Sequence, residues 1–136
     1  MDRQASPTAS PAVAPATPIQ EVAPVAPVAP VEGFFAYDVR VGTVVAARVN
    51  VGARVPALVL TIDFGELGPR VTSAQVTRRY APEALVGRQV VAVVNFPPKR
   101  IAGVRSEVLV LGGVPEKDDV VLLAPDTEVP NGTRIG

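Results

Sequence analysis

The chain has 136 residues, carries 13 basic and 13 acidic side chains, and contains neither cysteine nor histidine. A chain of this length favours a single domain. The absence of cysteine excludes a disulfide scaffold, a thiolate nucleophile and a zinc–thiolate centre, and the absence of histidine removes the usual general base near neutral pH. The balanced charge gives the chain no overall basic field.

Residues 1–32 predict a disordered Ala/Pro-rich tail, and residues 33–136 predict one folded domain. Alanine, valine and proline alone cannot bury enough apolar surface to offset the entropy lost on ordering. The repeat APVAPVAPV has the three-residue period of polyproline II, so this part predicts an extended spacer. Regular prolines disfavour a secretion signal, and no run approaches 18 apolar residues. We therefore expect neither a signal peptide nor membrane insertion.

Three strands are predicted in the first half of the domain. Residues 38–50 alternate with period two, which places Val39, Val41, Thr43, Val45, Ala47 and Val49 on one face. Residues 56–65 repeat the alternation, and residues 70–76 follow after a glycine- and proline-containing turn.

The second half begins with a short helix that the sequence predicts within residues 80–88. Pro82 suits the first helical position, Glu83 suits the positive end, and Gly87 suits the residue after the last turn. Extended segments follow over residues 88–95, 106–113 and 119–125. Short strands with one helix after the third predict an all-β, five-stranded OB-fold barrel with a short helix between strands 3 and 4. A β-sandwich is the alternative.

Between the fourth and fifth predicted strands lies the stretch VNFPPKRIAGVRSE, residues 94–107, which carries two prolines and three cations. Pro97 and Pro98 cannot donate to a strand ladder, so they end the strand and stiffen the segment. Lys99 and Arg100 then lie on a pre-ordered turn, and Gly103 allows the return into the next strand. A stiff cationic loop loses little entropy when it meets a partner. Alternatively, Phe96 and the prolines only cap the barrel.

Several blocks of the sequence resemble, in order, the CsaA family of export-related chaperones. They are DVRVGTVVAA, LTIDFGELG, SAQVTRRYAPEALVGRQVVAVVNFPPKRIAGVRSEVLVLG and VPNGTRIG, and together they cover about Phe34 to Gly136. This family belongs to a wider group of tRNA-binding OB domains, some of which are attached to aminoacyl-tRNA synthetases. Where related sequences read ARKPA and GFRSE, this chain reads ARVPA and GVRSE, so one cation and one aromatic residue are absent.

The resemblance implies a cytoplasmic OB-fold homodimer that binds tRNA or tRNA-like RNA without catalysing a reaction. Similar proteins are also described as binding unfolded preproteins during export. The group's motif falls on Asn95, Lys99, Arg100, Gly103, Ser106 and Glu107, and its SAQ block supplies Ser73 and Gln75. With Arg105 added as a further cation, the expected RNA-binding set is Ser73, Gln75, Asn95, Lys99, Arg100, Arg105, Ser106 and Glu107.

The chemistry of these side chains suits RNA. Lys99, Arg100 and Arg105 can meet phosphates, while Asn95, Ser106 and Gln75 can meet ribose hydroxyls and base edges. The chain has only six aromatic residues, which favours recognition of shape and phosphate over the reading of individual bases. Glu107 has two interpretations, as an RNA contact or as an anchor for Arg100 or Arg105.

A rival prediction is a peptide-binding chaperone whose RNA affinity is incidental. It needs an exposed apolar groove, for which the candidates are Phe96, Pro97, Pro98 and Ile101, or an exposed barrel edge that adds a peptide strand.

Catalysis is not expected, and neither is a cofactor or a metal. Asp118 and Asp119 precede an apolar run and indicate a turn into a strand, and Ser106 has no histidine to activate it. Tyr80 predicts packing beside the helix rather than a stacking platform.

Overall fold

The computed structural model describes residues 22–136. Most of the expected tail, residues 1–32, lies outside this range. Residues 22–30 have no regular secondary structure, and the 3₁₀ helix η1 (Val31–Ala36) follows them. In the described range no helix is long and apolar enough to cross a bilayer.

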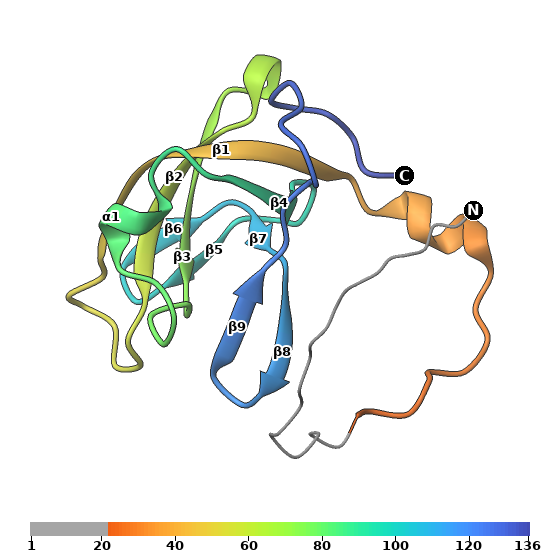
Figure 1. Ribbon diagram of the computed structural model, residues 1–136, viewed down its shortest axis with the longest axis horizontal. Helices are drawn as coiled ribbons and strands as arrows, with labels where there is room; N and C mark the ends of the chain where they lie inside the picture. Colours follow the sequence, from red (N-terminus) through yellow and green to blue (C-terminus); the bar gives the residue numbers. More distant parts are fainter. Residues whose placement is uncertain (1–21) are drawn as a thin grey trace, which may run out of the picture.

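Five strands form one antiparallel sheet in the order β3-β2-β1-β4-β7. Their bounds are β1 Val39–Val49, β2 Leu58–Asp63, β3 Pro69–Ala74, β4 Gln89–Val93 and β7 Leu109–Val110. The sheet curls into a nearly closed barrel, and helix α1 (Pro82–Leu85) lies between β3 and β4 in the chain (Figure 1). The predicted all-β, five-stranded OB-fold barrel is confirmed, and the β-sandwich alternative is not the observed fold.

Two hairpins form separate two-stranded sheets. The first joins β5 (Lys99–Ile101) to β6 (Val104–Ser106), and the second joins β8 (Gly112–Glu116) to β9 (Asp119–Leu122). A second 3₁₀ helix, η2 (Gly65–Leu67), connects β2 to β3. The single strand predicted over residues 106–113 is divided instead: Ser106 ends β6, β7 follows, and β8 begins at Gly112. Leu111, between β7 and β8, still donates its N–H to the carbonyl of Val91 in β4 at 2.9 Å.

A β-bulge in β1 changes which residues face the core. The pairing with β2 shifts between Val44 and Ala46, and Val44 is buried while Val45 is half exposed. The predicted single apolar face, which continued through Val45 and Val49, is wrong beyond the bulge. One extra residue in a strand of period two moves the following side chains to the opposite face.

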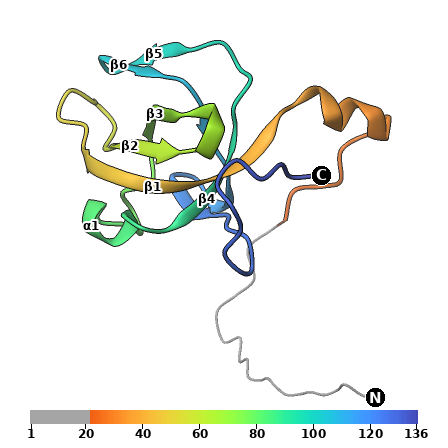
Figure 2. The same ribbon diagram turned by 90° about the horizontal axis from the view of Figure 1, so that it is seen from above.

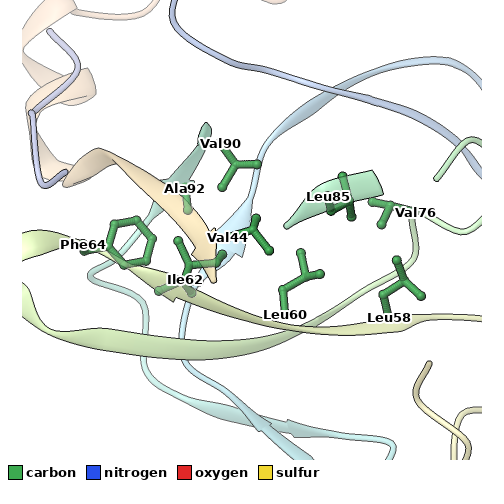
Figure 3. Close-up of a cluster of buried hydrophobic side chains, with 10 residues drawn as sticks. Val44, Leu58, Leu60, Ile62, Phe64, Val76, Leu85, Val90 and Ala92 are labelled. Atoms are coloured by element: carbon green, nitrogen blue, oxygen red, sulfur yellow. The ribbon is translucent and has the colours of Figure 1, made fainter. Parts of the chain in front are cut away.

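The main core fills the barrel between the sheet and α1. Figure 3 shows Leu58, Leu60, Ile62 and Phe64 in a row along β2 and its end, facing side chains from β1, β4 and α1. A second, smaller cluster of valines lies on the other face of β1 and β4, covered by Leu111, Val129 and Ile135.

Local signals place α1 as the sequence predicts. Pro82 occupies the first turn of the helix. Gly87, just past the C-terminal end of the helix, has a φ of +94°, which lies in the left-handed region that favours glycine. Tyr80 packs against the core, and its hydroxyl accepts a hydrogen bond from the backbone N–H of Leu122 at 3.0 Å. The packing role predicted for Tyr80 is confirmed, and Asp118, with a φ of 65°, forms the predicted turn into β9.

Candidate nucleic-acid interface

The basic segment between β4 and β7 is a hairpin rather than an irregular loop. Ala102 and Gly103 have φ values of 50° and 84°, a two-residue turn whose twist matches that of the flanking strands. Gly103 makes the return, as predicted, but Lys99 and Arg100 lie in β5 and not on the turn. The missed signal was the Ala-Gly pair between two short apolar-containing segments.

A cleft of about 530 Å³ lies over β3, between the β1–β2 loop and this hairpin. Figure 2 shows the loop and the hairpin tip on the same side of β3. The cleft is lined mainly by apolar groups, including Val55, Ile101, Val108 and Leu109, and also by Ser73, Gln75 and Arg54. In OB folds, this face and these two connections form the usual site for oligonucleotides.

A smaller depression of about 260 Å³ continues the cleft along the hairpin. It shares Ile101, Val108 and Leu109 with the larger cleft and adds Phe96, Pro97, Lys99, Ser106 and Glu107. Five of the eight expected RNA-binding residues therefore line this surface: Ser73, Gln75, Lys99, Ser106 and Glu107. Arg100 and Arg105 lie in the same hairpin without lining it, and Asn95 lies apart from it.

Ser106 and Glu107 close the barrel beside β3. The Glu107 carboxylate accepts a hydrogen bond from the backbone N–H of Val71 at 2.9 Å, and the Glu107 N–H donates to the Val71 carbonyl at 2.8 Å. The buried Ser106 hydroxyl accepts from the N–H of Ser73 at 2.9 Å. These side-chain oxygens accept the β3 N–H groups that a neighbouring strand would otherwise bind.

Glu107 also holds a cation, which was one of its two predicted interpretations. Its second carboxylate oxygen lies 3.1 Å from Nη1 of Arg105. The expected alternative partner, Arg100, instead donates to the carbonyl of Gly103 at 2.9 Å.

Asn50 links the β1–β2 loop to β3. Its amide nitrogen donates to the hydroxyl of Ser73 at 3.2 Å, and its oxygen accepts from the N–H of Gly52 at 3.2 Å. Asn50 is buried. Sequence reasoning missed this residue, and the available signal was an asparagine at the end of a strand, followed by a glycine-containing turn.

Asn95 is occupied at the other side of the barrel. Its side-chain oxygen accepts from the N–H of Asp38 at 2.8 Å, and its nitrogen donates to the carbonyl of Ala36 at 3.0 Å. The amide thus fastens the segment between η1 and β1.

The cations near the cleft differ in their partners. Within residues 22–136, Arg54, Lys99 and Arg100 make no ion pair, and all three side chains are exposed. Arg78 and Arg79, further along the same basic part of the sequence, pair with Glu116 and Asp119 of the second hairpin.

The Arg79–Asp119 pair is the more buried of these two. Two nitrogens of Arg79 donate to the two oxygens of Asp119, a carboxylate that is almost fully buried. These hydrogen bonds hold the pKa of Asp119 below its usual value and raise that of Arg79.

The four residues proposed for peptide contact are all exposed. Phe96 packs edge to face against Tyr37 with 5.9 Å between ring centroids, while Ile101 lines both parts of the cleft. In the described part of the chain, no group of three or more potential metal ligands comes together.

A family model described as "Putative tRNA binding domain" matches residues 39–134. The chain belongs to this family. The matched range of this tRNA-binding domain includes the whole sheet and both hairpins.

Solved structures of similar proteins support the fold and the resemblance to CsaA. The chaperone CsaA from Bacillus anthracis is 62% identical with a TM-score of 0.78, and the match covers 81% of this chain and 100% of that one. The CsaA chaperone protein from Picrophilus torridus is 41% identical with a TM-score of 0.74, at 80% and 100% coverage.

The tRNA-binding domain also matches much longer enzymes. The methionine–tRNA ligase of Methanothrix thermoacetophila is 45% identical over 102 residues, which are 75% of this chain but 15% of the ligase. The chain therefore spans about a seventh of the length of such relatives.

Proposed function

We propose that this protein binds tRNA, or RNA of tRNA-like shape, without catalysing a reaction. The observation that carries this proposal is the cleft between the β1–β2 loop and the β5–β6 hairpin, with exposed Arg54 in its lining. Exposed Lys99 lines the adjoining depression, and exposed Arg100 lies beside it in β5. Membership of the tRNA-binding domain family supports tRNA as the partner. The expected absence of catalysis is part of the proposal.

Lys99 and Arg100 are the proposed phosphate contacts. Both lie in β5, whose turn and preceding prolines fix the backbone before any partner binds. A cation that makes no ion pair with its neighbours can neutralise a phosphate without first losing a protein partner. Arg105 is the weaker candidate, since Glu107 already holds it.

The proposal extends to a cytoplasmic homodimer that acts as a chaperone in protein export. The support is the 62% identity to a CsaA chaperone over that protein's full length. Phe34, Phe35 and Tyr37 are also exposed beside β1, which is unusual for a monomer and consistent with a dimer contact.

The test is the salt dependence of tRNA binding. Lys99→Ala with Arg100→Ala should weaken binding and reduce the slope of log affinity against log salt by about two at most. Lys117→Ala with Arg88→Ala makes the same charge change away from the cleft and should leave the slope nearly unchanged. Equal slopes for the two double variants would remove the hairpin from the site.

A second candidate function is the binding of unfolded polypeptides, with RNA affinity incidental. It is favoured by the apolar depression lined by Phe96, Pro97 and Ile101. A labelled presequence peptide would then bind with little dependence on salt, and Ile101→Ser would weaken it. Steep salt dependence for tRNA together with weak peptide binding would favour RNA as the main ligand.

A further inference from the structure

The edge of β3 is hydrogen-bonded along only part of its length. Val71 exchanges hydrogen bonds with Glu107, and the N–H of Ser73 is taken by Ser106. These contacts show that the backbone groups of Val71 and Ser73 point away from β2. In an antiparallel ladder this direction alternates, so the residues between them point toward β2.

The same alternation directs two further backbone groups to the free side of β3. They are the carbonyl of Ser73 and the N–H of Gln75, and both residues line the cleft. Within residues 22–136, no loop or side chain makes a hydrogen bond to either group. The cleft therefore has one unpaired acceptor and, two residues later, one unpaired donor.

This free edge is too short for a peptide strand. The chain turns directly afterwards, because the N–H of Val76 donates to the carbonyl of Ala74 at 3.0 Å. Before Ser73 the edge is already capped by Ser106 and Glu107. An added strand would gain two hydrogen bonds, whereas strand addition depends on a run of main-chain bonds for its affinity.

One acceptor beside one donor matches the edge of a single nucleobase instead. The Watson–Crick edge of an unpaired base presents a donor next to an acceptor, and this edge is available only outside a duplex. Ile101, Val108 and Leu109 give the cleft apolar walls for the faces of a ring. Arg54 in the lining of the cleft and Lys99 in the adjoining depression lie where phosphates on either side of the base would pass.

We infer that the cleft holds one unpaired base of a bound RNA, with its edge against the Ser73 carbonyl and the Gln75 N–H. This inference rests on the proposed RNA-binding function and makes it more specific. It also modifies the expectation from sequence, which favoured shape and phosphate over individual bases. Because the Watson–Crick edge of a paired base is already occupied, the site selects unpaired bases over paired ones.

The test uses one RNA stem in three forms, with a single bulged adenosine, with an abasic nucleotide at the bulge, and fully paired. The first two carry the same charge and backbone. We expect the bulged adenosine to bind about tenfold more tightly than the abasic form, because stacking and edge contacts are lost together. Equal affinities, with tRNA still bound, would overturn the base site and leave the proposed function standing. Failure of tRNA and all three stems to bind would overturn both.

Two variants assign the effect to the backbone. Gln75→Pro removes the N–H donor, and Gln75→Ala keeps it while removing the side chain. Gln75→Pro should bind both bulged stems equally, whereas Gln75→Ala, which loses only the side chain, should still prefer the bulged adenosine to the abasic form. If circular dichroism shows that Gln75→Pro does not fold, the comparison of the three stems on the native protein tests the inference without it. A presequence peptide that displaces the bulged stem from the native protein but not from Gln75→Pro would overturn the inference in favour of strand addition.

Discussion

The carboxylate of Glu107 stands where the carbonyl of a neighbouring strand would accept the N–H of Val71. Ser106 does the same for Ser73 one step along the edge. The Ser-Glu pair of this chain therefore closes the barrel with side chains between β3 and β7. Within the proposed RNA-binding surface, this pair therefore has a structural role of its own, apart from any contact with RNA.

Glu107→Ala should lower the free energy of unfolding by about 1–3 kcal/mol, because the N–H of Val71 loses its acceptor. Glu107→Gln keeps an oxygen at that place and should be closer to the native protein. Arg105→Ala removes only the exposed ion pair and should change stability by less than about 1 kcal/mol. Urea denaturation measures all three, and equal losses for Glu107→Ala and Arg105→Ala would contradict the closing role.

Asn95→Ala should loosen the segment that leads into β1. The N–H of Asp38 loses its acceptor and the carbonyl of Ala36 loses its donor. Hydrogen exchange at Asp38 should accelerate about tenfold, while exchange at Val44 inside the barrel stays unchanged. Affinity for tRNA should fall less than it does in the Lys99→Ala, Arg100→Ala variant. A larger loss of affinity than in that double variant would return Asn95 to the RNA-binding set.

The Arg79–Asp119 pair predicts a pH-dependent contribution to stability. The pKa of Asp119 is held below its ordinary value of 3.8, mainly by hydrogen bonds from Arg79. The pair therefore stabilises the fold above about pH 4, and this contribution disappears as the pH falls through the lowered pKa. The native protein should have a higher melting temperature than Asp119→Asn at pH 7, and the difference should shrink toward pH 2.

Asp126→Asn is the control for this pH dependence, since Asp126 makes no ion pair within residues 22–136. Its melting temperature should follow that of the native protein across the same range. A difference for Asp119→Asn that stays constant from pH 7 to pH 2 would show that the pair acts through packing and not through charge.

Gly42→Ala should destabilise the barrel by about 1–3 kcal/mol. A Cβ at Gly42 would lie 2.6 Å from Cγ2 of Ile62 and 2.8 Å from the ring of Phe64, both inside the core. Gly113→Ala is the matched control, because its Cβ meets nothing closer than 4.0 Å. Thermal unfolding compares the two, and equal stability would mean that β1 and β2 separate without strain.

The fold was predictable because its signals are local. Strands of period two, a helix opened by Pro82 and closed by Gly87, and the position of that helix after the third strand all depend on neighbouring residues. The bulge at Val44 was not predictable, since it follows from the pairing of β1 with β2 and leaves the sequence pattern almost unaltered.

The site was predictable in its residue types and less so in their roles. Lys99 and Arg100 are exposed cations, as a basic segment with two prolines suggests. Ser106 and Asn95 make their hydrogen bonds to backbone groups 33 and 57–59 positions away. Such partners come together only in the closed barrel. From the polarity of Ser106 and Asn95 the sequence therefore predicted RNA contacts, whereas in the structure both side chains hold the protein backbone. The backbone groups of Ser73 and Gln75 carry no sequence signal at all.

The capped edge of β3 has a consequence for solubility. An open strand edge is a template on which copies of a protein pair and aggregate, and natural proteins block such edges. Here two consecutive side chains, Ser106 and Glu107, occupy the donors that an incoming strand would need first. Replacing either residue would therefore leave a folded barrel with a longer exposed strand edge. Ser106 and Glu107 thus also protect the protein from edge-to-edge aggregation.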